Sequence, residues 1–307
     1  MRPSRRRGLL LTATIVGLLL AALVSLALGA DGLSLVLGAA VVGAAFSVLA
    51  LLGGGGSAVT AGRRRGQGRG HRAAAGPRAP QREARIQGRR VIEAVEAAES
   101  RLFSQLEALD WLRAELQLQR PLPPTRGYAA APDALAQLVR ILDDRTPDSV
   151  VELGSGVSTI VIARRLQQAG RGRLVALEHL PEHAERTRGE LAAHGLADVG
   201  SVIDAPLEEV TIGSATWSWY RLGAGMPAAI DALFVDGPPG GTGTLARYPA
   251  LPLLVDRLAP GAVVFVDDGD RPDEREMVRR WQAEHEGLET RYLALTKGAW
   301  LFTTPRG

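Results

Sequence analysis

Short apolar runs alternate with amphipathic segments through the second half of the 307-residue chain, and this alternation restricts the fold more than any other feature. The runs have the length of strands, and the segments between them carry apolar residues at helical spacing. Strands that alternate with helices build a mostly parallel sheet whose two faces are covered by helices. We therefore expect seven strands, at residues 149–153, 174–177, 201–203, 230–235, 262–266, 290–295 and 299–303.

The expected fold class is α/β, Rossmann-like and doubly wound, with a mostly parallel seven-stranded sheet. Thr296, Lys297 and Gly298 join the last two strands, which predicts a C-terminal antiparallel hairpin at one edge. Helices are expected after Pro132 and at residues 157–166, 182–194, 251–258 and 273–286.

Acidic residues stand at or near the ends of five successive apolar strands. Open α/β sheets bind their ligands at this carboxyl edge. One such acid alone decides little, because Asp and Glu also cap the helices that follow strands. A series of five favours a ligand site, and its members are Glu152, Glu178, Asp204, Asp236 and Asp267 with Asp268.

A glycine-rich turn follows the first strand, in the sequence Val-Glu-Leu-Gly-Ser-Gly-Val-Ser-Thr of residues 151–159. Gly154 and Gly156 allow a tight turn and a close approach of the backbone to a ligand. A nicotinamide-type fingerprint needs Gly or Ala where Thr159 stands, and a Gly-Lys-Ser/Thr phosphate loop is absent. The chain also lacks cysteine, which excludes disulfides, Cys-ligated zinc, iron–sulfur clusters and thiol catalysis.

The run Glu152-Leu-Gly-Ser-Gly156 resembles the first motif of class I S-adenosylmethionine-dependent methyltransferases. The layout from about Ala131 to the C-terminus is also similar to theirs, so the resemblance implies S-adenosylmethionine as the cofactor. Carried over position by position, it implies a cofactor site at Glu152, Gly154, Ser155, Gly156, Ser158, Thr159, Glu178, His179, Asp204, Ala205 and Asp236.

Each part of the cofactor has an expected partner in this resemblance. The glycines pass beneath the methionine part, while Glu152 holds their loop. Glu178 accepts the ribose hydroxyls. His179 directly follows it on the cofactor side, where it either lines the cofactor site or lies at the surface. Asp204 and its neighbour match the adenine-edge position, and Asp236 lies beside the reacting methyl group.

More narrowly, Val235-Asp236-Gly237 and Val266-Asp267-Asp268 resemble the small-molecule O-methyltransferases related to catechol O-methyltransferase. Those enzymes hold Mg²⁺ on three such positions, which implies a metal site at Asp236, Asp267 and Asp268. This sequence departs from the pattern, because Asp268 stands where an Asn is usual and no Lys lies near the fourth strand.

Converging carboxylates need a metal, an arginine or a proton to compensate them. We take Asp236, Asp267 and Arg271 as the candidate catalytic residues on this ground. An alternative without metal stays open, in which Asp268 or Asp270 caps the next helix and Arg271 neutralises Asp267.

Other polar and aromatic residues also fall near the expected site. Trp217, Trp219 and Tyr220 lie between the third and fourth strands, where they form either a lid over the acceptor or a cluster that packs on the sheet. Residues placed to meet an acceptor are Arg247, Tyr248, Asp270, Arg271 and Glu274.

Two uncharged runs near the N-terminus, residues 9–28 and 33–52, are each long enough to cross a membrane as a helix. A four-residue turn joins them, so residues 1–53 are expected to form a transmembrane hairpin. A signal peptide is the alternative for the first run. Arg63, Arg64 and Arg65 follow the second run, and the positive-inside rule then places the catalytic domain in the cytoplasm of a multi-pass inner-membrane protein.

Charge is divided unevenly along the chain. Residues 1–90 hold 14 Arg and two acids, whereas the remainder holds 22 basic and 31 acidic residues. An acidic domain would repel phosphate backbones, so no nucleic-acid partner is expected. Residues 54–90 hold almost no large apolar side chains, which predicts a flexible basic linker.

Residues 91–118 carry apolar residues at spacings of three, four and seven, which predicts a long amphipathic helix within a segment of residues 91–120. It either packs on the following domain or pairs with a second copy as a homodimer. Residues 121–307 form the expected methyltransferase domain.

Together these features predict a membrane-anchored methyltransferase that modifies an oxygen of a small molecule, a sugar or a lipid-linked headgroup. The alternatives are a membrane-tethered scaffold that keeps the fold without turnover, and a nicotinamide-dependent oxidoreductase, which Thr159 disfavours.

Overall fold

The computed structural model describes residues 79–125, 127 and 129–306. The expected membrane hairpin of residues 1–53 and most of the expected linker lie outside the described residues. None of the helices within the described ranges is both long enough and apolar enough to span a bilayer. The described residues fall within one compact unit, Pro77–Gly307.

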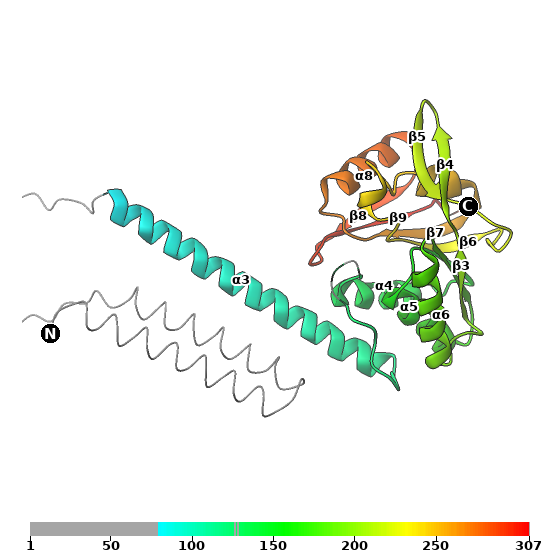
Figure 1. Cartoon of the computed structure of the whole chain (residues 1–307), viewed down its shortest axis with the longest axis horizontal. Coiled ribbons are helices and arrows are strands. Elements are labelled where there is room, and N and C mark those ends of the chain that lie inside the picture. The colour runs from blue at the N-terminus through cyan, green and yellow to red at the C-terminus, as the bar shows by residue number, and fades with distance from the viewer. Residues whose placement is uncertain (1–78, 126, 128, 307) are drawn as a thin grey trace, which may run out of the picture. The chain divides into compact units, whose positions relative to one another are not determined.

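A seven-stranded sheet forms the centre of this unit, with the strand order β3-β2-β1-β6-β7-β9-β8 (Figure 1). Its strands pair in parallel from β3 to β7, and β9 pairs antiparallel with both of its neighbours. The predicted seven-stranded, mostly parallel sheet with a C-terminal hairpin is therefore confirmed. The strands are β1 (Ser149–Leu153), β2 (Arg173–Glu178), β3 (Gly200–Asp204), β6 (Ile230–Val235), β7 (Leu258–Val266), β8 (Glu289–Leu293) and β9 (Ala299–Thr303).

Two apolar clusters cover the two faces of the sheet. Helices α4 (Pro132–Arg145), α5 (Val157–Ala169) and α6 (Pro181–Ala193) pack on one face. The other face carries α7 (Ala250–Leu254), α8 (Pro272–Glu284) and the short 3-10 helix η2 (Val255–Arg257). Proline occupies the first helical position of α4, α6 and α8, where its missing N–H has no helical partner to lose.

The segment between the third and fourth predicted strands forms a separate two-stranded sheet of β4 (Leu207–Ile212) and β5 (Ala215–Tyr220). Trp219 and Tyr220 at its end are fully buried in the second cluster. Trp217 stacks on Tyr248 with the ring centroids 4.8 Å apart. The interpretation of these aromatics as a cluster that packs on the sheet is thus confirmed.

The long helix α3 (Ala79–Glu115) begins well before its predicted start (Figure 1). Residues 79–90 were expected to be linker, and that expectation is wrong. The near absence of large apolar side chains excludes a packed core but not a helix, because Ala, Arg, Gln and Glu are strong helix formers. The C-terminal end of the helix docks on the domain through Leu112 and through Leu116, the residue after the helix. Both are fully buried, whereas residues 91–104 are exposed.

Candidate active site

Glu152 of β1 holds the glycine loop between β1 and α5 in place through hydrogen bonds. This carboxylate is buried and accepts hydrogen bonds from the hydroxyls of Ser158 and Thr159, the latter at 2.7 Å. Thr159 in turn accepts the N–H of Gly156 at 2.8 Å. Burial raises the pKa of Glu152 to about 7, because the charged form loses its hydration. Thr159 therefore ties the loop to the strand, at the position where a nicotinamide fingerprint has Gly or Ala.

Glu178, at the carboxyl end of β2, faces the same loop. Its Oε2 accepts the Ser155 hydroxyl at 3.0 Å, and its Oε1 accepts the backbone N–H groups of His179 and Leu180 at 2.9 and 3.1 Å. The Nδ1 atom of His179 lies 3.0 Å from Oε1. The structure thus brings the predicted ribose acid and the glycine loop together at one sheet edge.

The two residues predicted at the adenine edge differ in burial. Asp204 is exposed and forms an ion pair with Arg188 of α6 at 2.8 Å. Ala205 is fully buried, and its N–H donates to the carbonyl oxygen of Glu178 at 2.7 Å. The backbone of Ala205 is therefore fixed beside the end of β2, while the Asp204 carboxylate is held by α6.

Three carboxylates converge beyond the ends of β6 and β7. Asp236, Asp267 and Asp268 each offer an oxygen atom within 4.8 Å of the others. A buried arginine, Arg247, stands among them and is only 4% exposed. Its Nη2 donates to Asp236 Oδ1 at 3.0 Å and to Asp268 Oδ2 at 2.9 Å. The carboxylates are therefore brought together around a guanidinium group.

Further contacts hold this arginine in place. Its Nη atoms also donate to the backbone carbonyls of Asp236 and Asp267, both at 2.9 Å. Glu274, which is buried as well, lies 3.5 Å away as a third charged partner. Four acceptors and a planar fork of donors fix the orientation of the guanidinium.

The burial of the cluster changes its proton affinity. Burial first, and the neighbouring charge of Asp267 second, raise the pKa of Asp236 well above its usual range. Burial, aided by the charge of Asp268, raises the pKa of Asp267 to about 6. Within the described residues, neither carboxylate oxygen of Asp267 has a hydrogen-bond partner. Asp236 is the most exposed of the three acids, with 12% of its side chain accessible, so it is the one that faces outward.

Tyr220 of β5 reaches the space between the glycine loop and Gly237. A Cβ atom on Gly237 would lie 2.1 Å from the Tyr220 hydroxyl, so only glycine fits there. The hydroxyl is buried and has no hydrogen-bond partner in the part of the chain that the structure describes. Burial, and then the charge of Glu178, raise the pKa of this phenol well above its usual range.

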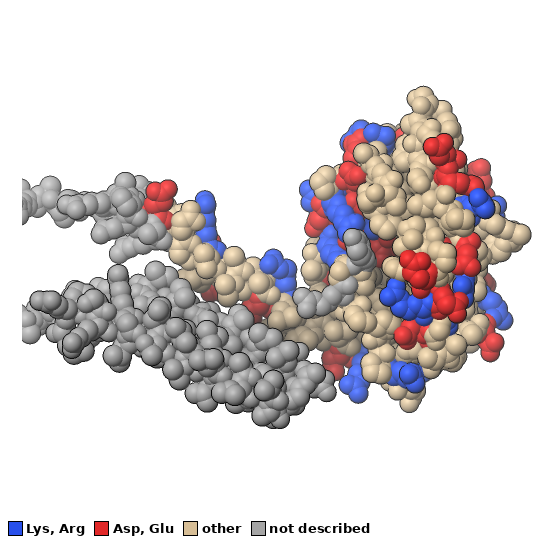
Figure 2. Space-filling model, in the orientation of Figure 1, with Lys and Arg blue, Asp and Glu red and all other residues tan. Residues whose placement is uncertain are grey.

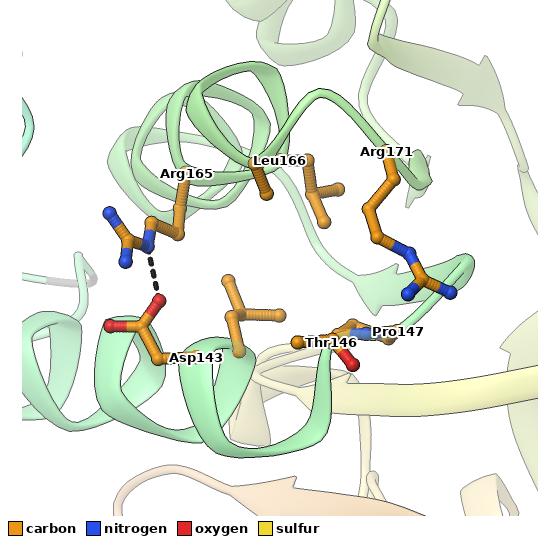
Figure 3. A pocket seen from close by; sticks show the side chains of 8 residues that line it. Asp143, Thr146, Pro147, Arg165, Leu166 and Arg171 are labelled. Carbon is orange, nitrogen blue, oxygen red and sulfur yellow. Dashed lines mark hydrogen bonds and ion pairs between the residues drawn. The ribbon is translucent and has the colours of Figure 1, made fainter.

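A separate pocket lies at the other edge of the sheet (Figure 3). It is formed by the C-terminal ends of α4 and α5, and Asp143 forms an ion pair with Arg165 at its rim. The glycine loop stands at the opposite end of α5, about 20 Å away for a helix of this length. This pocket therefore does not belong to the acid cluster or to the glycine loop.

Comparison with known proteins supports an enzymatic function for this domain. Residues 151–269, from β1 to just beyond β7, match a family model described as a methyltransferase domain. Protein-L-isoaspartate O-methyltransferase 2 of Archaeoglobus fulgidus is 27% identical over 59% of this chain and 72% of its own length. The corresponding enzyme of Aeropyrum pernix is 27% identical over 51% of this chain and 59% of its own, which is less than two thirds of its length.

The chain is an S-adenosylmethionine-dependent methyltransferase. The predicted enzyme class and cofactor are confirmed. The nicotinamide-dependent oxidoreductase and the scaffold without turnover are therefore set aside.

Two solved structures are also similar to this chain. A putative O-methyltransferase from Klebsiella pneumoniae is 20% identical, with 64% of this chain and 90% of that chain covered and a TM-score of 0.44. An O-methyltransferase from Streptomyces achromogenes, in complex with S-adenosylmethionine, is 24% identical, with 65% and 90% covered and a TM-score of 0.43.

The donor set of the methyltransferase does not fit Mg²⁺, although the three predicted acids do meet. Mg²⁺ requires oxygen ligands at about 2.0–2.1 Å in octahedral geometry. Arg247 Nη2 already bridges Asp236 and Asp268 at hydrogen-bond distance, so a cation could bind both only after the guanidinium had moved away. The prediction of Mg²⁺ is not supported, and the charge compensation comes from an arginine.

Arg271 compensates a different acid from the one expected. Its Nη2 lies 3.0 Å from Asp268 and its Nη1 lies 3.9 Å from Glu274, so the expected pairing with Asp267 is wrong. Sequence reasoning placed Arg247 near the acceptor and missed its role inside the acid cluster. Converging carboxylates need a positive charge nearby, and this need was the signal that could have pointed to Arg247. The sequence contains several arginines, however, and the signal does not choose among them.

Proposed function

We propose that the methyltransferase binds S-adenosylmethionine across the carboxyl ends of β1 and β2. Gly154 and Gly156 would pass beneath the methionine part, and Glu178 would accept the ribose hydroxyls. The contact between Ser155 and Glu178 supports this assignment, because one cofactor could then touch both the loop and the acid. Ala205, buried beside Glu178, would contact the adenine edge through its backbone, with Asp204 at the rim.

The acceptor would be an oxygen atom that meets the methyl group beside Asp236. In this proposal the Asp236 carboxylate takes the proton of an acceptor hydroxyl while the oxygen bonds to the methyl carbon and the carbon–sulfur bond breaks. S-Adenosylhomocysteine is then the leaving product. A pKa well above the usual range suits Asp236 to this role, because a stronger base removes a hydroxyl proton more readily.

Asp267 and Arg247 would act through Asp236 as positioning residues. The buried charge of Asp267 makes Asp236 more basic, and Arg247 fixes the Oδ1 atom of Asp236 at 3.0 Å. Arg271 would hold Asp268 and Glu274 at the outer side of the cluster. This arrangement, with one outward-facing acid above a buried cluster that two arginines hold, is the observation that carries the proposal.

A carboxyl group is a second candidate acceptor. The curated relatives from Archaeoglobus fulgidus and Aeropyrum pernix are named as protein-L-isoaspartate O-methyltransferases, and that acceptor is a carboxylate. A carboxylate carries no proton at neutral pH and needs no base. The Asp236→Asn variant therefore separates the two candidates, because it should lose the methylation of a hydroxyl but retain much of the methylation of a carboxylate.

The experiment that tests this function uses the full chain with methyl-labelled S-adenosylmethionine. Label would be followed into lipid and small-molecule extracts of the membrane, and into peptide methyl esters, which release methanol in base. Label in the extract supports the proposal, and label only in base-labile peptide esters supports the carboxyl alternative. Absence of label from every fraction, under conditions in which the cofactor binds, would contradict both.

The site of action is proposed to be the cytoplasmic face of the inner membrane. The two uncharged runs of residues 9–28 and 33–52 support an anchor, and the basic residues that follow them support a cytoplasmic domain. A lipid-linked headgroup would then be within reach of the enzyme. Dimer formation through residues 91–118 is not addressed by the comparisons.

A further inference from the structure

The upstream part of α3 presents a stripe of aliphatic side chains to solvent. Val91, Val95, Leu102 and Leu106 are 61%, 55%, 60% and 52% exposed. Ala98 is also exposed, and it lies between them on the same face. Amphipathic helices bury such a stripe against a partner, and the docking residues of α3 lie further along the helix, from Gln105 onward.

Two tandem segments of eleven residues make up this part of the helix. Residues 90–100 read RVIEAVEAAES and residues 101–111 read RLFSQLEALDW. Both begin with Arg followed by two large apolar residues. In both, the sixth position is apolar, the seventh and eighth are Glu-Ala, the ninth is apolar and the tenth is an acid. The repeat pairs Val91 with Leu102 and Val95 with Leu106.

A period of eleven residues has a structural meaning in paired helices. It corresponds to three turns of about 3.67 residues, so the stripe stays on one face along a straight or slightly right-handed pair. The stripe extends from Val91 to Leu109, which is about 27 Å of helix. The spacing looks irregular only when it is compared with a heptad.

Charges on the two edges of the stripe determine how two copies would fit. At 100° per residue, Arg90 and Arg101 lie on one edge, and Glu99 and Asp110 lie on the other. A parallel pair puts the basic edge of each helix against the acidic edge of its partner, whereas an antiparallel pair puts like edges together. Charge complementarity therefore favours a parallel arrangement.

We propose that residues 90–110 of α3 form a parallel, in-register pair with the same residues of a second copy of this chain. The partner helix would cover Val91, Val95, Leu102 and Leu106. The last turn of α3 stays on its own domain, because Leu112 and the following Leu116 are already buried there. The pairing does not depend on the identity of the methyl acceptor.

The absence of cysteine from the chain gives a direct test. Val91→Cys and Leu106→Cys would be introduced singly into the full chain and oxidised, and disulfides would be read by gel mobility without reductant. In a parallel, in-register pair each variant faces its own copy within the 4.4–6.8 Å Cα separation that a disulfide needs. We expect most of each variant to migrate as a covalent dimer of about twice the 32.5 kDa chain mass.

Ser104→Cys is the matched control, because residue 104 is exposed on the opposite side of the same helix. It should form little covalent dimer at the same concentration. Equal cross-linking of all three variants, or none at positions 91 and 106, would overturn the proposal. Cross-linking only when the Val91→Cys and Leu106→Cys chains are mixed would show an antiparallel pair and would overturn the parallel one.

Discussion

Arg247 donates a hydrogen bond of 2.9 Å to Asp268, and both side chains are almost completely buried. The pair lies within a cluster that also contains Asp236, Asp267 and Glu274. On the visible face of the domain, acidic and basic side chains are interspersed (Figure 2), and water and salt screen their charges. Water and salt do not reach the buried acids, so the arrangement of the site depends on this arginine.

The Arg247→Met variant should be strongly destabilised. Removing the guanidinium leaves buried carboxylates without a counter-charge, which costs about 3–5 kcal/mol in the free energy of unfolding. Chemical denaturation measures the loss. The control is Arg271→Met, which removes a 42% exposed partner of the same Asp268 and should cost no more than about 1 kcal/mol. Equal losses would show that Arg247 has no special role.

Methyl transfer should be insensitive to EDTA. Because Arg247 supplies the positive charge among the three acids, removal of divalent cations takes nothing from the site. The measurement compares initial rates with EDTA, with added Mg²⁺ and with neither. A rate that EDTA abolishes and Mg²⁺ restores would mean that the guanidinium leaves the cluster during turnover.

The Glu178→Ala variant should bind S-adenosylmethionine more weakly by about 1.5–3 kcal/mol, the range for lost hydrogen bonds to a charged group. Isothermal titration of the full chain with the cofactor measures the change. Glu182→Ala, an exposed acid in the first turn of α6, is the control and should bind as the wild type does. Unchanged affinity in Glu178→Ala would mean that the ribose binds elsewhere.

Asp267→Asn should shift the pH profile of methyl transfer. If Asp236 is the base, activity rises with pH as its carboxyl loses a proton. The charge of Asp267 is the second cause that raises the pKa of Asp236, after burial. Removing that charge lowers the pKa of Asp236, so the rising limb moves to lower pH. Asp270→Asn, an exposed acid paired with Arg275, should leave the profile in place. A rising limb at the same pH in both variants would contradict the proposed role of Asp267.

The proposed membrane topology predicts the behaviour of reporter fusions. A reporter that is active only outside the cytoplasm should be silent when it is fused after Gly307, because the arginines after the second apolar run retain that end inside. The same reporter fused after Gly32, in the turn between the two runs, should be active. Activity after Gly307 would reverse the orientation, and silence at both positions would exclude the hairpin.

The order and type of the elements were predictable because they depend on local periodicity. The strands Ser149–Leu153, Ile230–Val235 and Ala299–Thr303 begin and end where their apolar runs do. The glycine loop could also be placed, since its residues are adjacent in sequence. The early start of α3 was not predicted. The linker prediction rested on the lack of residues for a packed core and left out the high helix propensity of the same residues.

The content of the acid cluster could not be predicted in the same way. The topology of a parallel sheet brings the acids at the strand ends together. Which positive side chain neutralises them depends on which distant segment packs among them. Arg247 comes from an irregular segment after β6, where no periodic signal indicates its direction. Tyr220 comes from the separate two-stranded sheet of β4 and β5. Sequence patterns report local conformation and burial, whereas the choice of partner between distant segments is made only when the whole core packs.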